Sequence, residues 1–582
     1  MSKRIVVDPI TRIEGHLRVE VIVDDNNKIT EAYSSSTLWR GLENIVKGRD
    51  PRDVGFFVGR ICGVCTYSHY RAGIEAAEDA LGIEPPLNAK LVRSLMNAAL
   101  YLHDHPVHFY HLHGLDWVDV VSALSADPAK ASKDAFNYTE TPMFTGEDHL
   151  KAVQKRVAEF VKKGHLGPFA NAYWGHPTYK LTPEENLIAL SHYLEGLRFQ
   201  RIAAQMMAIF GAKQPHPQNL TVGGVTCIMD LKDPSRLGEF LTKFKELASF
   251  INNCYYADLV MAGRAYANEP SVTTGYGVAN LLTYKEFLLN SNEYLFEDGI
   301  MMAEDVVALL EGREFKVHEI DEAKITEEAT HAWYKNDAAL HPYDGETEPN
   351  YTGFKDAETI NGKGELEHSK VVDGAGKYSW IKAPRYDSQP MQVGPLSNIV
   401  INYAKGNKKV VKVVDQFLKD TGLPISAVPT TLGRTACRMI EAKVIADNAL
   451  EAFNALVENL KVDDSTYTTY SIDKNKEYKG RFMGNAPRGI LSHWIRVKNG
   501  VCENYQAVVP STWNASPKDA RGARGPYEES LIGITLSDLS QPLEIIRIIH
   551  SYDPCIACAV HVLDTKGNEL STYRVDPNST TC

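Results

Sequence analysis

Two Cys-x-x-Cys motifs at opposite ends of the sequence constrain the fold of this chain more than any other feature. The first lies in RICGVCTYSH (60–69) and the second in DPCIACAVH (553–561). The paired motifs of structural zinc ribbons lie about 15 to 20 residues apart, because the metal organises a small local fold. Here most of a chain of 582 residues separates them. If the four thiols act together, the fold must bring both ends of the chain to one place.

The chemistry of four thiols favours a metal centre. Thiolates in a protein interior persist only where metal ions neutralise their charge, and soft thiolate ligands select zinc, copper(I), iron-sulfur or a nickel/iron centre. A single Cys-x-x-Cys motif is also typical of a redox dithiol or an inert buried pair. Such a dithiol needs only one motif, whereas both motifs here are followed by a histidine, His69 and His561. The pattern favours a shared metal site, and a structural zinc site stays open.

Composition excludes several classes of protein. The formal net charge of −12 argues against nucleic acid as a partner, which requires a concentrated basic face. We find no run of about 18 apolar residues that predicts a membrane span, and we expect a soluble globular protein. The N-terminus alternates apolar and polar residues where an export signal would have an apolar core, so we expect none on this chain.

The periodicity of the chain predicts an α+β fold, mainly α. The first forty residues alternate like an antiparallel sheet, and from residue 71 apolar residues recur three and four apart, as in long helices that pack as a bundle. We expect a long central helix bundle with small antiparallel sheets at the termini, in one interleaved catalytic unit over 1–561. Its expected parts are an N-terminal sheet with the first motif (1–70), a helical bundle (71–310), irregular excursions (311–390), and helices and hairpins with the second motif (391–561).

The two cysteine motifs resemble the signature pair of the nickel-iron hydrogenase large (catalytic) subunit. The resemblance extends to DPITRIEGHLRVE, WRGLE, HDHPVHFYHLHGLDWVD, APRGILSHW and YQAVVPSTWN, in the order in which the family has them. It covers nearly the whole chain and is closest to the respiratory, uptake-type branch. It implies the fold of that subunit and the reversible heterolytic cleavage of H2 to protons and electrons.

The resemblance also implies a metal centre. Cys62 and Cys555 would be terminal nickel ligands, and Cys65 and Cys558 would bridge nickel to an iron that carries carbon monoxide and cyanide. A second site for magnesium, or iron, would use Glu43, the backbone carbonyl of Ala507 and the imidazole of His561.

Further residues are implied around the metals. Arg488 would hang over them beside the carboxylates Asp104 and Asp553, and Glu14 would be the first carboxylate of a proton route, next to Cys555. Pro487 and Ser511 would line the pocket of the diatomic ligands, and His69 would hydrogen-bond a bridging thiolate.

The histidines at 103, 105, 108, 111 and 113 resemble a metal-binding strip. We expect them to serve packing instead, because the family uses this helix in that way.

Partners and processing follow from the resemblance. After the four motif cysteines, the remaining five show no iron-sulfur cluster motif, so the electron relay is expected in an iron-sulfur small subunit, as a heterodimer or a dimer of heterodimers. A membrane cytochrome b or quinone-linked subunit is a further expected partner.

The implied location is periplasmic and membrane-associated through the partners, and cytoplasmic as a precursor. The tail 562–582 is expected to be cleaved after His561 on maturation. The alternative functions are an H2-sensing subunit and a quinone-reductase-type subunit, and the latter would lack the four thiols that this chain has.

Overall fold

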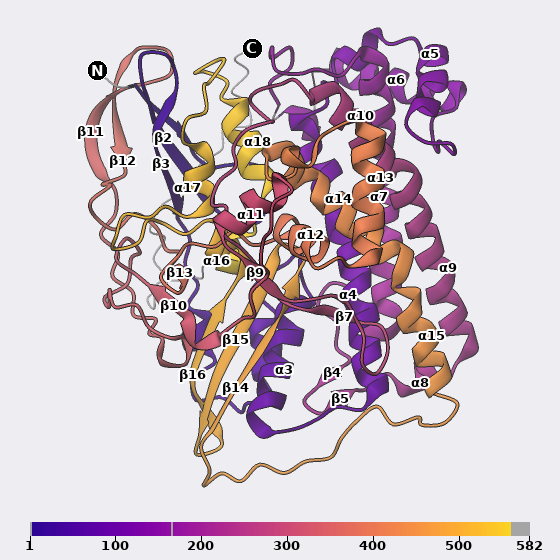
Figure 1. Ribbon diagram of the computed structural model, residues 1–582, viewed down its shortest axis with the longest axis vertical. Coiled ribbons are helices and arrows are strands. Elements are labelled where there is room, and N and C mark those ends of the chain that lie inside the picture. The colour runs from indigo at the N-terminus through magenta and orange to yellow at the C-terminus, as the bar shows by residue number, and fades with distance from the viewer. Residues whose placement is uncertain (1–2, 165–166, 171, 560–582) are drawn as a thin grey trace.

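The computed structural model describes residues 3–164, 167–170 and 172–559, with the side chains of Pro168, Cys558 and Ala559 excepted. Helices form one side of the molecule and short antiparallel sheets the other (Figure 1). The expected α+β, mainly α architecture with small antiparallel sheets is confirmed. Among the described residues, no helix is both long and apolar enough to span a membrane.

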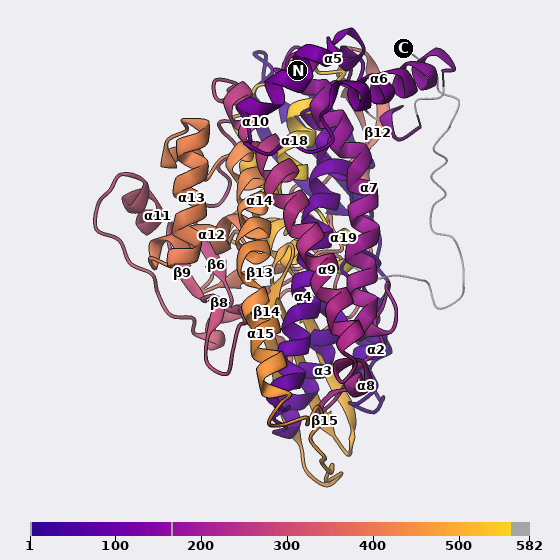
Figure 2. The ribbon, with the colours of Figure 1, turned by 90° about the vertical axis from the view of Figure 1, so that its right-hand side faces the viewer.

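Long helices make up the bundle, and in Figure 2 several of them stand side by side. Their bounds are α3 Ser68–Leu81, α4 Leu87–Val107, α6 Glu147–Lys162, α7 Pro183–Gly211, α9 Pro234–Phe250, α10 Tyr256–Tyr266, α12 Pro395–Ala404, α13 Lys408–Thr421, α14 Thr431–Asn448 and α15 Leu450–Asn459. Their apolar faces form one continuous buried core, which includes Leu95, Phe250 and Met439. This core fixes the end of α4, which carries Asp104, relative to the sheets.

Local signals explain where the helices begin and end. The Thr182 side chain accepts a hydrogen bond from the N–H of Glu185, whose carboxylate accepts one from the N–H of Thr182, and Pro183 occupies the first turn of α7. α4 contains Pro106 and continues into a π-helical turn, η1 (His108–His113). Since proline removes a backbone donor, the wider turn that follows it has a local cause.

Shorter helices lie between the longer elements. They are α1 Leu42–Ile45, α2 Val54–Val58, α5 Pro128–Asp134, α8 Ile228–Leu231, α11 Ala303–Leu310, α16 Pro510–Asn514, α17 Pro526–Leu531, α18 Leu543–Ser551 and α19 Ile556–Ala559. α18 ends just before the second cysteine motif, and α19 begins inside it.

Two three-stranded antiparallel sheets frame the site. One is β1 (Lys3–Val7), β2 (Leu17–Val23) and β3 (Ile29–Ser36), and the other is β14 (Tyr478–Ala486), β15 (Gly489–Lys498) and β16 (Val501–Val508). In the first sheet Val7 pairs with Val19, and in the second Ala486 pairs with Gly489 across the turn that holds Arg488. α3 packs against this second sheet around a buried cluster that contains Cys62, Cys65 and Cys555.

Small two-stranded pairs complete the sheets. They are β4 (Leu220–Thr221) with β5 (Gly224–Val225), β6 (Leu281–Thr283) with β9 (Gly299–Met301), β7 (Glu286–Leu288) with β8 (Tyr294–Phe296), β10 (Ile325–Glu328) with β13 (Ala383–Tyr386), and β11 (Lys355–Ile360) with β12 (Leu366–Val371). The last two pairs lie inside the segment 311–390 that we expected to be irregular. The division of the chain into parts otherwise stays a prediction.

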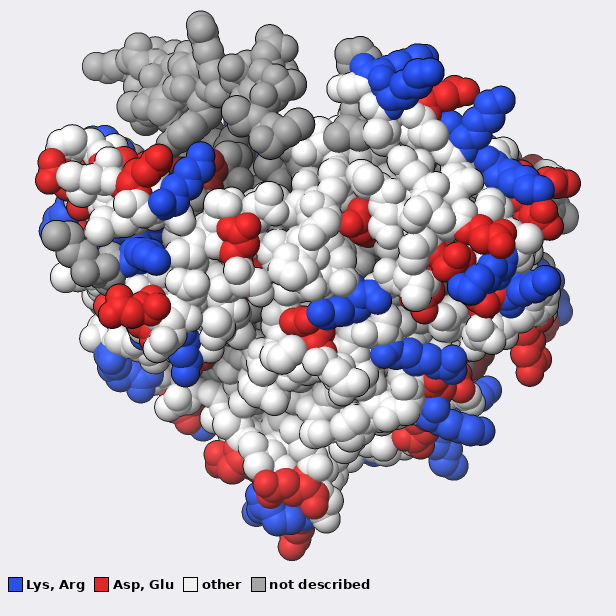
Figure 3. Space-filling view, turned by 90° about the horizontal axis from the view of Figure 1, so that it is seen from above, with Lys and Arg blue, Asp and Glu red and all other residues white. Residues whose placement is uncertain are grey.

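Charged side chains of both signs are interspersed over the face seen from above in Figure 3. Within the part of this face that the structure describes, basic side chains do not gather into one broad area.

Candidate metal centre

The first cysteine motif forms a tight loop between α2 and α3. The backbone N–H groups of Val64 and Cys65 point at the sulfur of Cys62, at 3.3 and 3.1 Å. Cys62 is fully buried and Cys65 nearly so. Backbone N–H groups can donate to a thiolate, so this loop suits a sulfur ligand of a metal.

The second motif is held by the N-terminal segment of the chain. The N–H of Glu14 donates to the carbonyl of Pro554 at 3.2 Å, and the N–H of Ile556 donates to the carbonyl of Glu14. Glu14 and Cys555 therefore pair as a parallel bridge. The N–H of Cys555 also donates to Ser511 Oγ at 3.0 Å, which ties the motif to α16.

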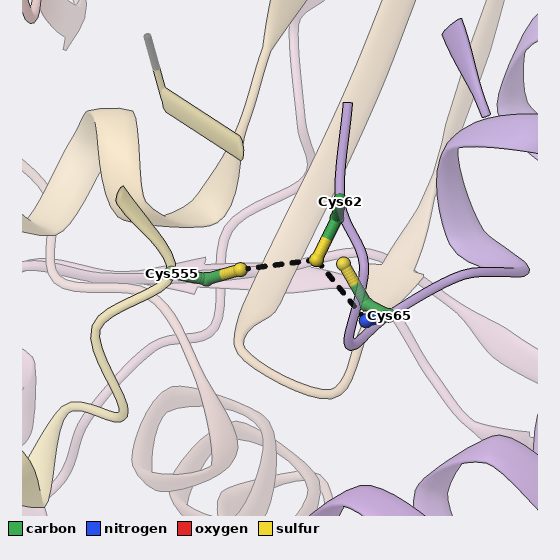
Figure 4. A group of neighbouring side chains, drawn as sticks. All are labelled: Cys62, Cys65 and Cys555. Atoms are coloured by element: carbon green, nitrogen blue, oxygen red, sulfur yellow. Dashed lines mark hydrogen bonds between the residues drawn. The ribbon is translucent and has the colours of Figure 1, made fainter. Parts of the chain in front are cut away.

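The two motifs meet in the interior. The sulfurs of Cys62 and Cys555 lie 3.3 Å apart although 493 positions separate the residues, and the Cys65 sulfur lies with them within 4.8 Å (Figure 4). A disulfide bond would require the two sulfurs to lie about 2.05 Å apart, so these cysteines are not joined by one. Cys558 lies on α19, its side chain is outside the described part of the structure, and His561 lies outside the described residues altogether.

Arg488 occupies the two-residue turn between β14 and β15. It forms ion pairs with Asp104 Oδ2 at 2.9 Å and with Asp553 Oδ1 at 3.1 Å, and all three side chains are buried. Burial opposes the charge of Arg488, but Asp553, Cys555, Asp104 and Cys65 hold its pKa well above the ordinary value. The predicted grouping of Arg488 with two carboxylates is thus present beside the thiols.

A close backbone approach fixes this turn. Gly489 has φ +125°, and a Cβ there would lie 2.5 Å from the backbone nitrogen of Gly394. Only glycine allows that contact. The turn carrying Arg488 therefore rests directly on the segment before α12.

Arg438 was not predicted from the sequence, yet it joins the same group. From α14 its guanidinium donates to the backbone carbonyl of Pro487 at 3.1 Å and to that of Ser551 at 3.3 Å, and it lies 3.6 Å from Asp553 Oδ2. One side chain thus links the Arg488 turn to the second cysteine motif. A sequence signal existed, since Arg434, Arg438 and Glu441 recur four and three apart in α14.

Glu14 lies beside the first motif as well as the second. Its carboxylate accepts a hydrogen bond from the N–H of Gly63. Burial, with the nearby Cys62 thiol, raises the pKa of Glu14 above its ordinary value, while Gly63, Arg488 and Arg40 act in the opposite direction. Its carboxylate is therefore positioned between the two cysteine motifs.

The remaining predicted pocket residues have defined surroundings. Ser511 binds the Cys555 backbone, as described above, and Pro487 forms the Arg488 turn with its carbonyl bound by Arg438. His69 Nδ1 lies 2.9 Å from His493 Nε2, and burial lowers the pKa of His69 to about 4. Its hydrogen bond to a bridging thiolate stays a prediction.

Glu43 lies in a second polar cluster. Its Oε1 accepts the N–H of Ala507 at 3.0 Å and its Oε2 accepts the hydroxyl of Thr347. Lys382, 3.8 Å from Glu43, donates to Gln506 Oε1 at 2.7 Å. The contact of Ala507 is through its N–H, so the predicted role of its carbonyl stays a prediction.

Glu327 on β10 belongs to the same cluster and was not predicted. It is buried, its Oε2 has no hydrogen-bond partner within the described structure, and it lies 4.0 Å from Lys382. Burial raises its pKa to about 7. Both Glu327 and Lys382 come from the segment expected to be irregular, where local pattern carries no signal of the pairing of β10 with β13.

The histidines of the α4 segment contact different partners. His105 Nε2 binds Glu441, His108 Nε2 binds the carbonyl of His550, and His111 Nε2 binds the carbonyl of Tyr193. His103 binds Asp104, and His113 binds Asp116. Each of these rings is thus held by its own hydrogen bond, and the expectation that they serve packing instead of binding a metal stays a prediction.

The donor sets fit the implied metals. Three buried thiols within 4.8 Å cannot all ionise without a cation, and sulfur ligands suit nickel and iron. At the second cluster the unpartnered Glu327 oxygen beside Glu43 suits a hard cation such as magnesium.

Comparison with known proteins agrees with this geometry. The family model "Nickel-dependent hydrogenase" matches residues 40–561, and the model "HoxL-like" matches residues 4–35. The quinone-reactive Ni/Fe-hydrogenase large chain of Wolinella succinogenes is 67% identical over 582 residues and covers 100% of both chains. The uptake hydrogenase large subunit of Rhizobium leguminosarum bv. viciae is 44% identical and covers 99% of this chain and 98% of its own.

Among solved structures, the Ni-Fe-Se hydrogenase of Desulfovibrio vulgaris Hildenborough matches with a TM-score of 0.73 and 29% identity, covering 96% of this chain and 100% of that one. With the cysteine geometry, these matches define the class: the chain belongs to the nickel-dependent hydrogenase family. Within it the chain is the large, catalytic subunit of a nickel-iron hydrogenase, as the sequence motifs predicted.

Proposed function

We propose that this chain oxidises dihydrogen at a nickel-iron centre held by Cys62, Cys65, Cys555 and Cys558. The observation that carries the proposal is the meeting of three of these thiols, from both ends of the chain, below the guanidinium of Arg488. The bound centre, with carbon monoxide and cyanide on its iron, would polarise dihydrogen and accept its two electrons. The reaction converts H2 to two protons and two electrons, and the electrons would pass to the iron-sulfur clusters of a small subunit.

The side chains of this subunit supply the surroundings of that reaction. Asp104 and Asp553 hold the Arg488 guanidinium over the thiols, where its fixed positive charge stabilises the polarised substrate. Pro487 and Ser511 close the pocket that would receive the diatomic ligands, and His69 would bind a bridging thiolate.

Glu14 would take the departing proton. Its backbone pairing with residues 554–556 sets its carboxylate against the cysteine motifs, and a short transfer from a thiol to a carboxylate needs that proximity.

A magnesium or iron ion would bind at the second cluster, with Glu43, Ala507 and His561 as protein ligands. Lys382, Gln506 and Glu327 surround this position and would orient water on the ion. The ion would thereby fasten the chain beyond the second cysteine motif to β16.

An iron-sulfur small subunit would receive the electrons. A groove of about 400 Å³ reaches the loop of the first cysteine motif and is lined by Gly63, Val64, His103, Leu197 and Pro215, among others. Leu197 is 53% exposed, which favours burial by a protein partner. A partner seated there would bring a cluster close to the metals, as electron transfer requires.

The relatives support a respiratory role. One is named as quinone-reactive and another as an uptake hydrogenase, which favours H2 oxidation for this chain over H2 sensing. We propose a heterodimer or a dimer of heterodimers that delivers electrons to a quinone-linked membrane subunit, such as a cytochrome b, from the periplasmic side. The chain would be folded and processed after His561 in the cytoplasm, with loss of 562–582, and exported with its small subunit.

Infrared spectroscopy tests the proposed centre. In purified, active enzyme we expect the stretching bands of iron-bound carbon monoxide and cyanide, together with nickel in a one-to-one ratio to the chain. Cys65→Ser should abolish the infrared bands and the bound nickel. Cys437 is a buried cysteine of α14 outside the site, so Cys437→Ser should keep both. Active wild-type protein without these bands would refute the proposal.

A further inference from the structure

A second cluster of metal-ligating side chains lies outside the thiol site. His113, Asp116 and His550 are fully buried, and one ligand atom of each lies within 4.8 Å of the others. Two histidines and one carboxylate are a common metal-binding set, so the cluster requires an explanation.

Its hydrogen bonds show why a metal is not needed there. Asp116 Oδ2 accepts from His113 Nδ1 at 2.8 Å and from His550 Nδ1 at 2.6 Å, while Asp116 Oδ1 pairs with Arg12. His113 Nε2 accepts from the indole N–H of Trp117 at 2.9 Å. The carboxylate already has a permanent positive partner, and each ring nitrogen has its own bond, which a metal would have to break.

Each ring nitrogen of His550 faces an oxygen acceptor. Its Nε2 lies 2.8 Å from the carbonyl oxygen of Thr11, which can only accept, and its Nδ1 faces a carboxylate. Asp116 therefore bonds both Arg12 and His550.

The cluster joins the segments on which the proton route depends. Thr11 and Arg12 lie three and two positions before Glu14, and Arg12 also donates to the carbonyl of Leu112. His550 lies in the last turn of α18, which leads into Cys555. Asp116 follows the π-helical turn at the end of α4, so one carboxylate joins the N-terminal segment to the second cysteine motif.

We propose that Asp116 is a positioning residue for proton transfer: through Arg12 and His550 it holds Glu14 in register with Cys555. The transfer that depends on this register breaks an S–H bond and forms an O–H bond on the Glu14 carboxylate, with no change in electron count. The inference rests on the proposed role of Glu14 and adds the residue that sets its position.

Isotope exchange separates this role from general stability. Conversion of para-hydrogen to ortho-hydrogen requires only that H2 is split and reformed at the site, whereas exchange of D2 with protons of water also requires protons to leave it. The ratio of exchange to conversion thus measures proton transfer in the complete, nickel-loaded enzyme. Each rate is divided by nickel content, which corrects for incomplete loading.

Four variants make the comparison. Asp116→Asn removes the charge with little change in shape, and Arg12→Lys keeps the charge but loses the fork that reaches both Asp116 and Leu112. Glu14→Gln is the reference for a blocked route. Asp258→Asn is the matched control, because Asp258 is an equally buried carboxylate paired with a histidine, His192, at 2.8 Å, away from both cysteine motifs.

We expect the ratio to fall about tenfold or more in Asp116→Asn and Arg12→Lys, as in Glu14→Gln, and to stay at the wild-type value in Asp258→Asn. A wild-type ratio in both loaded network variants would overturn the proposal while leaving the role of Glu14 intact. Loss of nickel from both, with Asp258→Asn loaded, would also overturn it, since the cluster would then serve site assembly. A wild-type ratio in Glu14→Gln would refute the proton route itself.

Discussion

The substitution Gly15→Ala tests whether the contact between the N-terminal segment and the second cysteine motif supports the metal site. Gly15 has φ +91°, and a Cβ at this position would lie 2.3 Å from the backbone nitrogen of Ala557 and 2.8 Å from the carbonyl carbon of Ile556. Ordinary contacts of a Cβ begin at 3.4 Å. The two segments must therefore separate by about 1 Å to accept a methyl group, which strains a packed interior.

The magnitude follows from two contributions. An alanine in a left-handed conformation costs about 1 to 2 kcal/mol, and the overlap with backbone atoms costs about 1 to 3 kcal/mol more. We therefore expect a loss of about 2 to 5 kcal/mol in the free energy of unfolding of this region. A displacement of about 1 Å between Glu14 and Cys555 should lower turnover about 100-fold.

Gly48→Ala provides the matched control. Gly48 has φ +80°, but a Cβ there meets no atom within 4 Å, so this variant bears the conformational cost alone. Nickel content, H2-dependent dye reduction and melting temperature of the two variants are measured in parallel. If Gly15→Ala equals Gly48→Ala in turnover per nickel, the contact does not set the geometry of the site and the reasoning is wrong.

Three further predictions follow from buried charges. Arg488→Lys should lower turnover per nickel about 100-fold, because one ammonium group cannot reach Asp104 and Asp553 together. The rate of H2-dependent dye reduction, divided by nickel content, checks this prediction. A rate near that of the wild type would contradict it. Burial lowers the pKa of His192, but Asp258 and Cys254 raise it more, so the pKa lies well above its ordinary value. The protonated ring therefore stabilises the folded state fully below a pH of about 6.5, and this contribution is lost as pH rises through the pKa of the folded state. The melting temperature of His192→Gln should accordingly decline less with rising pH than that of the wild type, and equal slopes would refute the assignment. Lys382→Met should make the melting temperature more sensitive to EDTA, because a bound cation would be the main remaining counter-charge for Glu43 and Glu327; an unchanged response would argue against a cation there.

Much of the helix bundle is predictable because its signals are local. α7 occupies the stretch from Pro183 to Gly211 that the apolar spacing, the Pro and the Gly indicate. The hairpin of β15 and β16 turns at Asn499 and Gly500, as its alternating pattern predicts. The π-helical turn η1 follows Pro106, but a proline alone does not specify a π-helical turn, and His111 of this turn binds the carbonyl of Tyr193 on the distant helix α7.

The candidate site divides in the same way. Cys62, Cys65, Cys555, Arg488 and Asp104 could be named from motifs, because each motif has a distinctive spacing. Lys382 and Glu327 could not, because an isolated charge in a polar segment most often lies on the surface. Arg438 has a local signal in its spacing from Arg434 and Glu441, but its partners Pro487, Ser551 and Asp553 lie far away in the sequence. The functional surroundings of these three residues, Lys382, Glu327 and Arg438, arise only when strands and helices far apart in sequence pack together.

The pairing of Cys62 with a cysteine 493 positions later has a consequence for biosynthesis. While the chain leaves the ribosome, the first motif exists for most of the elongation time without its counterpart. Contacts of such high sequence separation form late and slowly. A nascent enzyme of this design therefore offers two exposed thiols to any passing metal ion or oxidant, and its biogenesis depends on protecting them until translation reaches the second motif.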